Sequence, residues 1–149
     1  MKIEEAINTV FKSPQQKAII NIRYTSNYIY TIQTEFMLEF DLSMPQFNIL
    51  RILRGAKKAL NVNTVKERMI EKSPNTTRLM DKLVAKNLIL RSHCNEDRRV
   101  VYAEISENGL KLLNNIDVKL TENNIFHDHL NDEESELLSN LLDKVRKTI

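Results

Sequence analysis

TVKERMIEKSPNTTRLMDKLVAKNLILRSHCNEDRRVVYAEI, residues 64–105, contains two helical patterns followed by two strand patterns. Val65, Met69 and Ile70 are spaced to lie on the inner side of a short helix over 64–71. Ser73-Pro74 is an N-cap followed by a proline at the first helical position, which predicts a second helix to Asn87. A turn of only a few residues between two helices is typical of a helix-turn-helix.

The strand patterns follow at once. Leu88–His93 and Val100–Ile105 are rich in β-forming residues, and the polar segment 94–99 between them predicts a hairpin. Asn87, just before the first strand, suits the left-handed position that ends a helix. A helix-turn-helix followed by a hairpin predicts a winged helix-turn-helix, here over residues 42–105.

Longer helical patterns lie on both sides of this lobe. Ser13-Pro14 with Gln16 predicts a capping box and a helix to about residue 40. Similar caps at Ser43, Ser106 and Asn131 predict three more helices. The expected fold class is therefore mainly α with a small β-hairpin wing (α+β), in one domain over residues 1–149, with helical regions at 13–41 and 106–149.

Composition excludes several kinds of function. Two glycines cannot form a glycine-rich phosphate loop, and one cysteine cannot form a disulfide framework or a cysteine-based zinc site. Residues with a recognisable catalytic spacing are lacking, so we expect no enzyme activity, no cofactor and no catalytic residues. We also expect no membrane span and a cytoplasmic location, since the first residues lack the apolar segment of a signal peptide.

Charge is divided unevenly along the chain. Residues 51–99 carry 13 Lys and Arg against 5 Asp and Glu, whereas the rest of the chain carries 9 against 15. A basic middle with acidic ends is typical of a module that binds a polyanion.

The order of elements and two motifs resemble the MarR family of bacterial transcriptional regulators. Glu96-Asp97-Arg98-Arg99 is similar to the family's Asp-x-Arg wing signature, and Ser106-Glu107-Asn108-Gly109 to the T-E-x-G that opens the next helix. Asn87 and Val100 depart from the usual glycine and small residue. The resemblance implies a transcriptional regulator that binds double-stranded DNA in a sequence-specific manner and acts as a ligand-responsive repressor.

Candidate DNA-binding residues follow from this resemblance and from helix periodicity. Thr76, Met80 and Leu83 are spaced to face the core, so the polar side of the helix enters the major groove. Arg99 is expected to enter the minor groove, with Asp97 orienting an arginine through a charge-assisted hydrogen bond. The full set is Ser73, Asn75, Thr77, Arg78, Lys82, Asp97, Arg98 and Arg99.

The resemblance further implies a homodimer through residues 13–41 and 106–149, which reads a pseudo-palindromic operator, and a small-molecule effector. Arg23, Tyr24 and Tyr28 are candidates for an effector site, although core packing is the favoured interpretation of this aromatic stripe. Cys94 beside His93 is interpreted as a bystander thiol. His127 and His129 are two residues apart and face different sides of a helix, so we expect no metal site.

A second class of function remains open. The same fold could be a protein–protein interaction module whose basic face binds an acidic partner without specific DNA binding. Affinity for duplex DNA that falls steeply with salt distinguishes the two, because phosphate contacts release counterions.

Overall fold

The N-cap residues predicted from the sequence are found at the starts of two helices. In α3 (Met44–Ala56), the Ser43 hydroxyl accepts a hydrogen bond from the Gln46 N–H at 3.3 Å, and the Gln46 side chain accepts one from the Ser43 N–H at 3.0 Å. Asn131 and Glu134 make the same reciprocal pair, at 2.9 and 3.0 Å, at the start of α7 (Asp132–Arg146). Both predicted caps are confirmed.

The cap of α2 (Pro14–Leu38) differs in one detail. The Ser13 hydroxyl accepts from the Gln16 N–H at 3.1 Å, as predicted, but the Gln16 side chain accepts from the Lys12 N–H at 2.8 Å. The predicted box with Ser13 is therefore wrong in its second half, because the glutamine reaches one residue further back.

This computed structural model describes residues 1–72, 74–123 and 129–147. Internal contacts divide the chain into two units, Met1–Leu110 and Lys111–Ile149. Ser73 and His127 lie outside the described residues.

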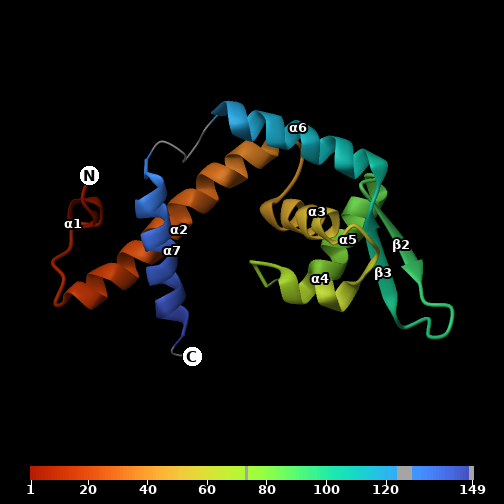
Figure 1. Ribbon diagram of the computed structural model, residues 1–149, viewed down its shortest axis with the longest axis horizontal. Helices are drawn as coiled ribbons and strands as arrows, with labels where there is room; N and C mark the ends of the chain where they lie inside the picture. The colour runs from red at the N-terminus through yellow and green to blue at the C-terminus, as the bar shows by residue number, and fades with distance from the viewer. Residues whose placement is uncertain (73, 124–128, 148–149) are drawn as a thin grey trace. The chain divides into compact units, whose positions relative to one another are not determined.

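The first unit contains the winged lobe, shown in Figure 1. Besides α2 and α3, the first unit contains α1 (Ile3–Ala6), β1 (Leu60–Asn61), α4 (Val62–Arg68), α5 (Thr76–Ala85), β2 (Ile89–His93) and β3 (Val101–Ile105). The strands form an antiparallel sheet in the order β1-β3-β2, with Leu60 and Arg91 both opposite Ala103. The predicted hairpin is thus present, and β1 adds a third strand to it.

The core of the lobe draws apolar side chains from α3, α4, α5 and the sheet. Eight of them are at most 1% exposed: Ile49, Leu50, Leu53, Val65, Met80, Leu83, Ile89 and Ala103. Because these side chains come from every element around α5, that helix is held on a packed scaffold rather than on a loop.

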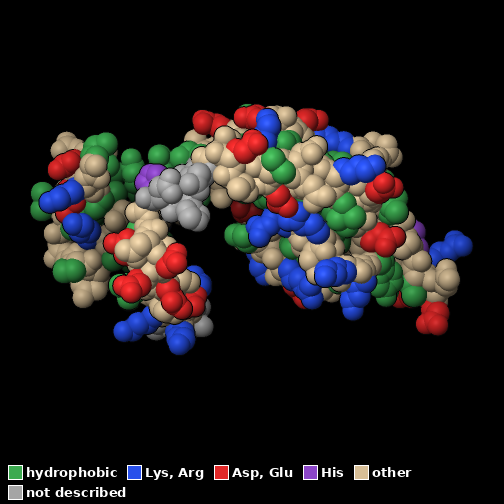
Figure 2. All heavy atoms as spheres, turned by 45° about the horizontal axis from the view of Figure 1, so that its top comes forward, with side chains coloured by type: hydrophobic (Ala, Val, Ile, Leu, Met, Phe, Trp, Pro, Cys, Tyr) green, Lys and Arg blue, Asp and Glu red, His purple; other side chains and the backbone are tan. Residues whose placement is uncertain are grey.

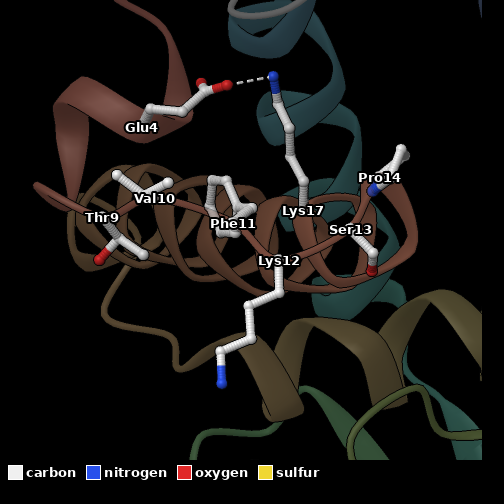
Figure 3. A pocket seen from close by; sticks show the side chains of 8 residues that line it. All are labelled: Glu4, Thr9, Val10, Phe11, Lys12, Ser13, Pro14 and Lys17. Atoms are coloured by element: carbon white, nitrogen blue, oxygen red, sulfur yellow. Dashed lines mark hydrogen bonds and ion pairs between the residues drawn. The ribbon is translucent and has the colours of Figure 1, made fainter.

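The N-terminal residues form a short arm against the start of α2, which the sequence did not predict. Glu4 of α1 pairs with Lys17 of α2, and the segment between them borders an open hollow of about 560 Å³ (Figure 3). The hydrogen bond from Lys17 lowers the pKa of the Glu4 carboxyl.

The second unit contains most of α6 (Glu107–Asn123) and all of α7. Leu113 and Ile116 of α6 are fully buried, whereas α7 has no buried residue. Within the described ranges, no helix combines the length and apolar character that a membrane crossing requires.

Candidate nucleic-acid interface

The turn between α4 and α5 differs from its prediction. The backbone of Met69 is extended (φ −66°, ψ 137°), so α4 ends at Arg68 and not near residue 71. Met69 remains in the core, where its sulfur accepts a hydrogen bond from the Thr76 hydroxyl at 3.6 Å. Ile70 is 76% exposed, and its predicted place on the inner side of the helix is wrong because the helix has already ended.

α5 also begins later than predicted. Asn75 is its N-cap and Thr76 its first residue, which leaves Pro74 in the preceding turn instead of at the first helical position. The proposed cap at Ser73 falls on a residue outside the described ranges, and the observed start at Thr76 contradicts it.

The two sides of α5 are arranged as the sequence predicted. Thr76, Met80 and Leu83 are at most 1% exposed. The opposite side is exposed throughout and carries Pro74, Asn75, Thr77, Arg78, Asp81 and Lys82. The structure therefore brings the described candidates of the major-groove set to one solvent-facing surface.

The end of α5 is fixed by its backbone. Asn87 has the predicted left-handed conformation (φ 57°). Its N–H donates to the Val84 carbonyl at 2.9 Å, and the Leu88 N–H donates to the Leu83 carbonyl at 3.0 Å. These two bonds form a Schellman motif, which turns the chain directly into β2.

Two ion pairs hold α5 from outside the core. Asp81 pairs with Arg91 of β2. Lys86, the C-cap of α5, lies 2.8 Å from the Asp41 carboxylate and also donates to the Asp41 carbonyl. Hydrogen bonding to Lys86 lowers the pKa of Asp41. Sequence reasoning missed both pairs, since no spacing rule relates Asp41 to Lys86.

Asp97 shapes the tip of the wing through the backbone. Its carboxylate accepts a hydrogen bond from the Arg99 N–H at 2.9 Å, and its carbonyl accepts one from the Val100 N–H at 2.9 Å. The expected bond to an arginine side chain is thus replaced by an Asx-turn to the Arg99 backbone. Arg98 and Arg99 are both exposed at this tip.

The effector candidates do not form part of the chain's core. Tyr24 is 45% and Tyr28 57% exposed, and Arg23 is also exposed. The favoured interpretation, that these side chains pack in the core of the chain, is therefore wrong. A hollow of about 540 Å³ lies elsewhere, lined in part by Thr34, Lys82 and Lys86.

Near the wing, Cys94 is a half-buried free thiol. His93 Nδ1 lies 3.0 Å from the Arg98 carbonyl oxygen. Arg91, three residues before Cys94 in the sequence, pairs with Asp81.

Positive charge gathers around these elements. Figure 2 shows many Lys and Arg side chains over the part of the molecule that carries the winged lobe. This agrees with the excess of basic residues between positions 51 and 99. An exposed polar helix, a three-stranded sheet with an extended hairpin and a basic surface together define a winged helix-turn-helix protein.

Comparison with known proteins gives the family. A family model for the MarR family matches residues 42–101. YfiV, an uncharacterised HTH-type transcriptional regulator of Bacillus subtilis, is 37% identical over 75 residues, which cover 50% of this chain and 46% of that protein. MhqR, another HTH-type regulator of the same organism, is 30% identical over 114 residues, which cover 70% of this chain and 72% of MhqR.

A solved structure of a MarR transcription factor is also similar to this chain. The MarR transcription factor from Planctomyces limnophilus has a TM-score of 0.69 and 30% identity, covering 90% of this chain and 98% of that one. The chain belongs to the MarR family of transcriptional regulators. That family consists of regulators rather than enzymes, as the sequence led us to expect.

Proposed function

We propose that the protein is a homodimeric regulator that binds double-stranded DNA in a sequence-specific manner and acts as a ligand-responsive repressor. The observation that carries this proposal is the arrangement of α5, whose inner side is fully buried while Asn75, Thr77 and Arg78 are exposed at its N-terminal end. Recognition helices of this class contact base edges with residues near their N-terminus.

The proposed contacts divide between the two grooves. In the major groove, Arg78 can donate two hydrogen bonds to guanine, and Asn75 can pair with adenine. Thr77 lies beside them, while Ser73 and Lys82 are assigned to phosphates. In the minor groove, Arg99 enters where the groove is narrow and electronegative, with Arg98 at its edge and Asp97 holding the tip.

A second copy of the chain is the proposed partner of the helical regions 13–41 and 106–149. In α7, Leu137, Leu138, Leu141 and Val145 are between 45% and 61% exposed. In α2, Ile19 is 48% and Tyr30 41% exposed. Burial of such stripes against a second copy is favoured by about 25 cal/mol per Å² of apolar surface. A two-fold dimer would read half-sites about 34–36 Å apart.

The proposed effector site rests on the chemistry of one exposed patch. Tyr24 and Tyr28 are four residues apart on one side of α2, Arg23 is next to Tyr24 in the sequence, and all three side chains are exposed. That composition suits a small anionic or phenolic ligand, whose binding would change the affinity for DNA.

Fluorescence anisotropy with duplex DNA tests the proposed function. A duplex is first selected from a random-sequence library with the full-length protein and is then compared with a scrambled duplex at two salt concentrations. We expect tight binding to the selected duplex, much weaker binding to the scrambled one, and a steep loss of affinity at high salt. Equal, weak binding to both would favour the alternative of a protein–protein interaction module.

A further inference from the structure

The recognition helix α5 is held on both of its flanks. Asp81 follows Arg78 by three residues and Lys82 follows it by four, so they lie on opposite sides of Arg78. On the side of Asp81 the helix is tied to Arg91 of β2. On the other side, one turn beyond Lys82, Lys86 ties the helix to Asp41 in the turn before α3.

Asp81 is an unexpected residue for the place it occupies. It is an exposed acid on the same side of α5 as Arg78, the side that the proposed function puts in the major groove, between the phosphate backbones of DNA. A carboxylate there is repelled by the phosphates. Its pairing with Arg91 both offsets that negative charge and connects α5 to the wing.

Arg91 has a defined place in the sheet. It is the third residue of β2, opposite Ala103 of β3, and its side chain is 26% exposed. The two strands continue from this point to the tip that carries Arg98 and Arg99. A small change in the angle of the hairpin at Arg91 is therefore enlarged at the tip.

We propose that Asp81 and Arg91 are positioning residues for DNA recognition, whose ion pair sets the wing relative to α5 so that major-groove and minor-groove contacts form in one register. This inference rests on the proposed DNA binding. An ion pair that is partly open to solvent contributes little to folding stability. Its expected effect is on the geometry of the wing, where preorganisation lowers the ordering cost of binding.

Two substitutions break the pair with opposite changes in charge. Asp81→Asn removes a negative charge and Arg91→Gln removes a positive one. If the residues acted only through their charge, Asp81→Asn would tighten DNA binding, Arg91→Gln would weaken it, and the contribution of Arg99 would stay the same in both. If they position the wing, both variants reduce the contribution of Arg99.

A double-mutant cycle measures that contribution. In the wild-type background we expect Arg99→Ala to weaken binding to the selected duplex about tenfold. In the Asp81→Asn and Arg91→Gln backgrounds we expect the same substitution to cost about threefold or less, a coupling within the range of contacting residues. Glu67→Gln, an exposed acid of α4, is the matched control, and in it the full effect of Arg99→Ala should remain.

The outcomes separate this inference from the proposed function. A reduced effect of Arg99→Ala in both pair-breaking variants, with the control unchanged, supports the positioning role. An undiminished effect in either variant overturns it while leaving DNA binding intact. A wild-type protein that does not distinguish the selected from the scrambled duplex overturns the proposed function and this inference together.

Discussion

The hydroxyl of Ser106 donates a hydrogen bond to the carbonyl oxygen of Asn87 over 2.6 Å and accepts one from the Gly109 N–H at 3.0 Å. The Ser106 N–H also donates to the Leu88 carbonyl at 3.0 Å. One serine therefore caps the first turn of α6 and holds it against the chain that leaves the recognition helix.

This close approach requires a glycine at position 109. A Cβ there would lie 2.3 Å from the Leu88 carbonyl oxygen and 2.7 Å from Ile105 Cγ1. We expect Gly109→Ala to lower the free energy of unfolding by about 1–3 kcal/mol, because a methyl group would have to displace backbone. Urea denaturation measures the change.

Gly55 provides the control for that substitution. It lies in α3, and a Cβ added to it would have no neighbouring atom within 4 Å. We expect Gly55→Ala to stabilise the protein by up to about 1 kcal/mol, since alanine favours the helix. Equal effects of the two substitutions would contradict the role given to the Ser106 joint.

Asp97 is expected to act through the shape of the wing tip. Asp97→Ala removes the acceptor for the Arg99 N–H and should weaken binding to the selected duplex several-fold, with the melting temperature nearly unchanged. Asp97→Asn keeps an acceptor oxygen in the same place and should bind as well as wild type. Anisotropy of both variants checks this, and a loss in Asp97→Asn as large as in Asp97→Ala would assign the effect to charge instead.

Substitutions of Arg78 and Lys82 should change DNA binding in different ways. Arg78→Ala is expected to cost about 1–3 kcal/mol on the selected duplex and to relax the preference at one base position. Lys82→Ala should weaken binding to selected and scrambled duplexes alike and reduce the salt slope by about 1. Titrations at several salt concentrations, repeated on single-base variants of the duplex, distinguish base contact from phosphate contact.

The Asp41–Lys86 pair predicts a dependence of stability on pH. Because Lys86 lowers the pKa of Asp41 in the folded state, the pair stabilises the fold above the ordinary aspartate pKa. That contribution is lost as the pH falls through the lowered value. Asp41→Asn should therefore melt below wild type at neutral pH and converge with it in acid.

Asparagine is a suitable replacement at position 41 because Asp41 has a left-handed backbone (φ 53°), which asparagine tolerates. Thermal melts from neutral to strongly acid pH follow the difference. A gap between the two proteins that stays constant across this range would show that the pair does not titrate as described.

The exposed stripe of α7 predicts the oligomeric state. Leu137→Glu with Leu141→Glu places two charges on that stripe, where both leucines are more than half exposed in the single chain. We expect wild type to sediment as a dimer at micromolar concentration and the double variant as a monomer with its lobe still folded. Wild type that sediments as a monomer would refute the homodimer.

The sequence predicted best the features that depend on neighbouring residues. The reciprocal caps of Ser43 with Gln46, the left-handed Asn87 and the buried side of α5 all follow from spacings within one helix. The exposed side of α5 was predicted for the same reason, because a helix with one buried side leaves the other in solvent.

Features that need distant residues were missed. β1 has two residues and exists only through pairing with Ala103 and Tyr102 of β3, far along the chain. The ion pairs of Asp41 with Lys86 and of Asp81 with Arg91 likewise depend on the tertiary fold. The start of α5 was misplaced because the proline rule describes a preference that the turn after Met69 overrides.

Asp97 holds the backbone of Arg99, and the Arg99 side chain is exposed to solvent. In the proposed complex the guanidinium therefore gives up its rotamer freedom only when it meets DNA, at a cost of about 2 kcal/mol. Where the neighbouring DNA has a wide minor groove, its attraction for the guanidinium does not offset that cost, whereas the stronger attraction of a narrow minor groove does. Binding at a site with a wide minor groove would then be weaker by that cost, so the protein would dissociate from unsuitable sites quickly while it searches a genome.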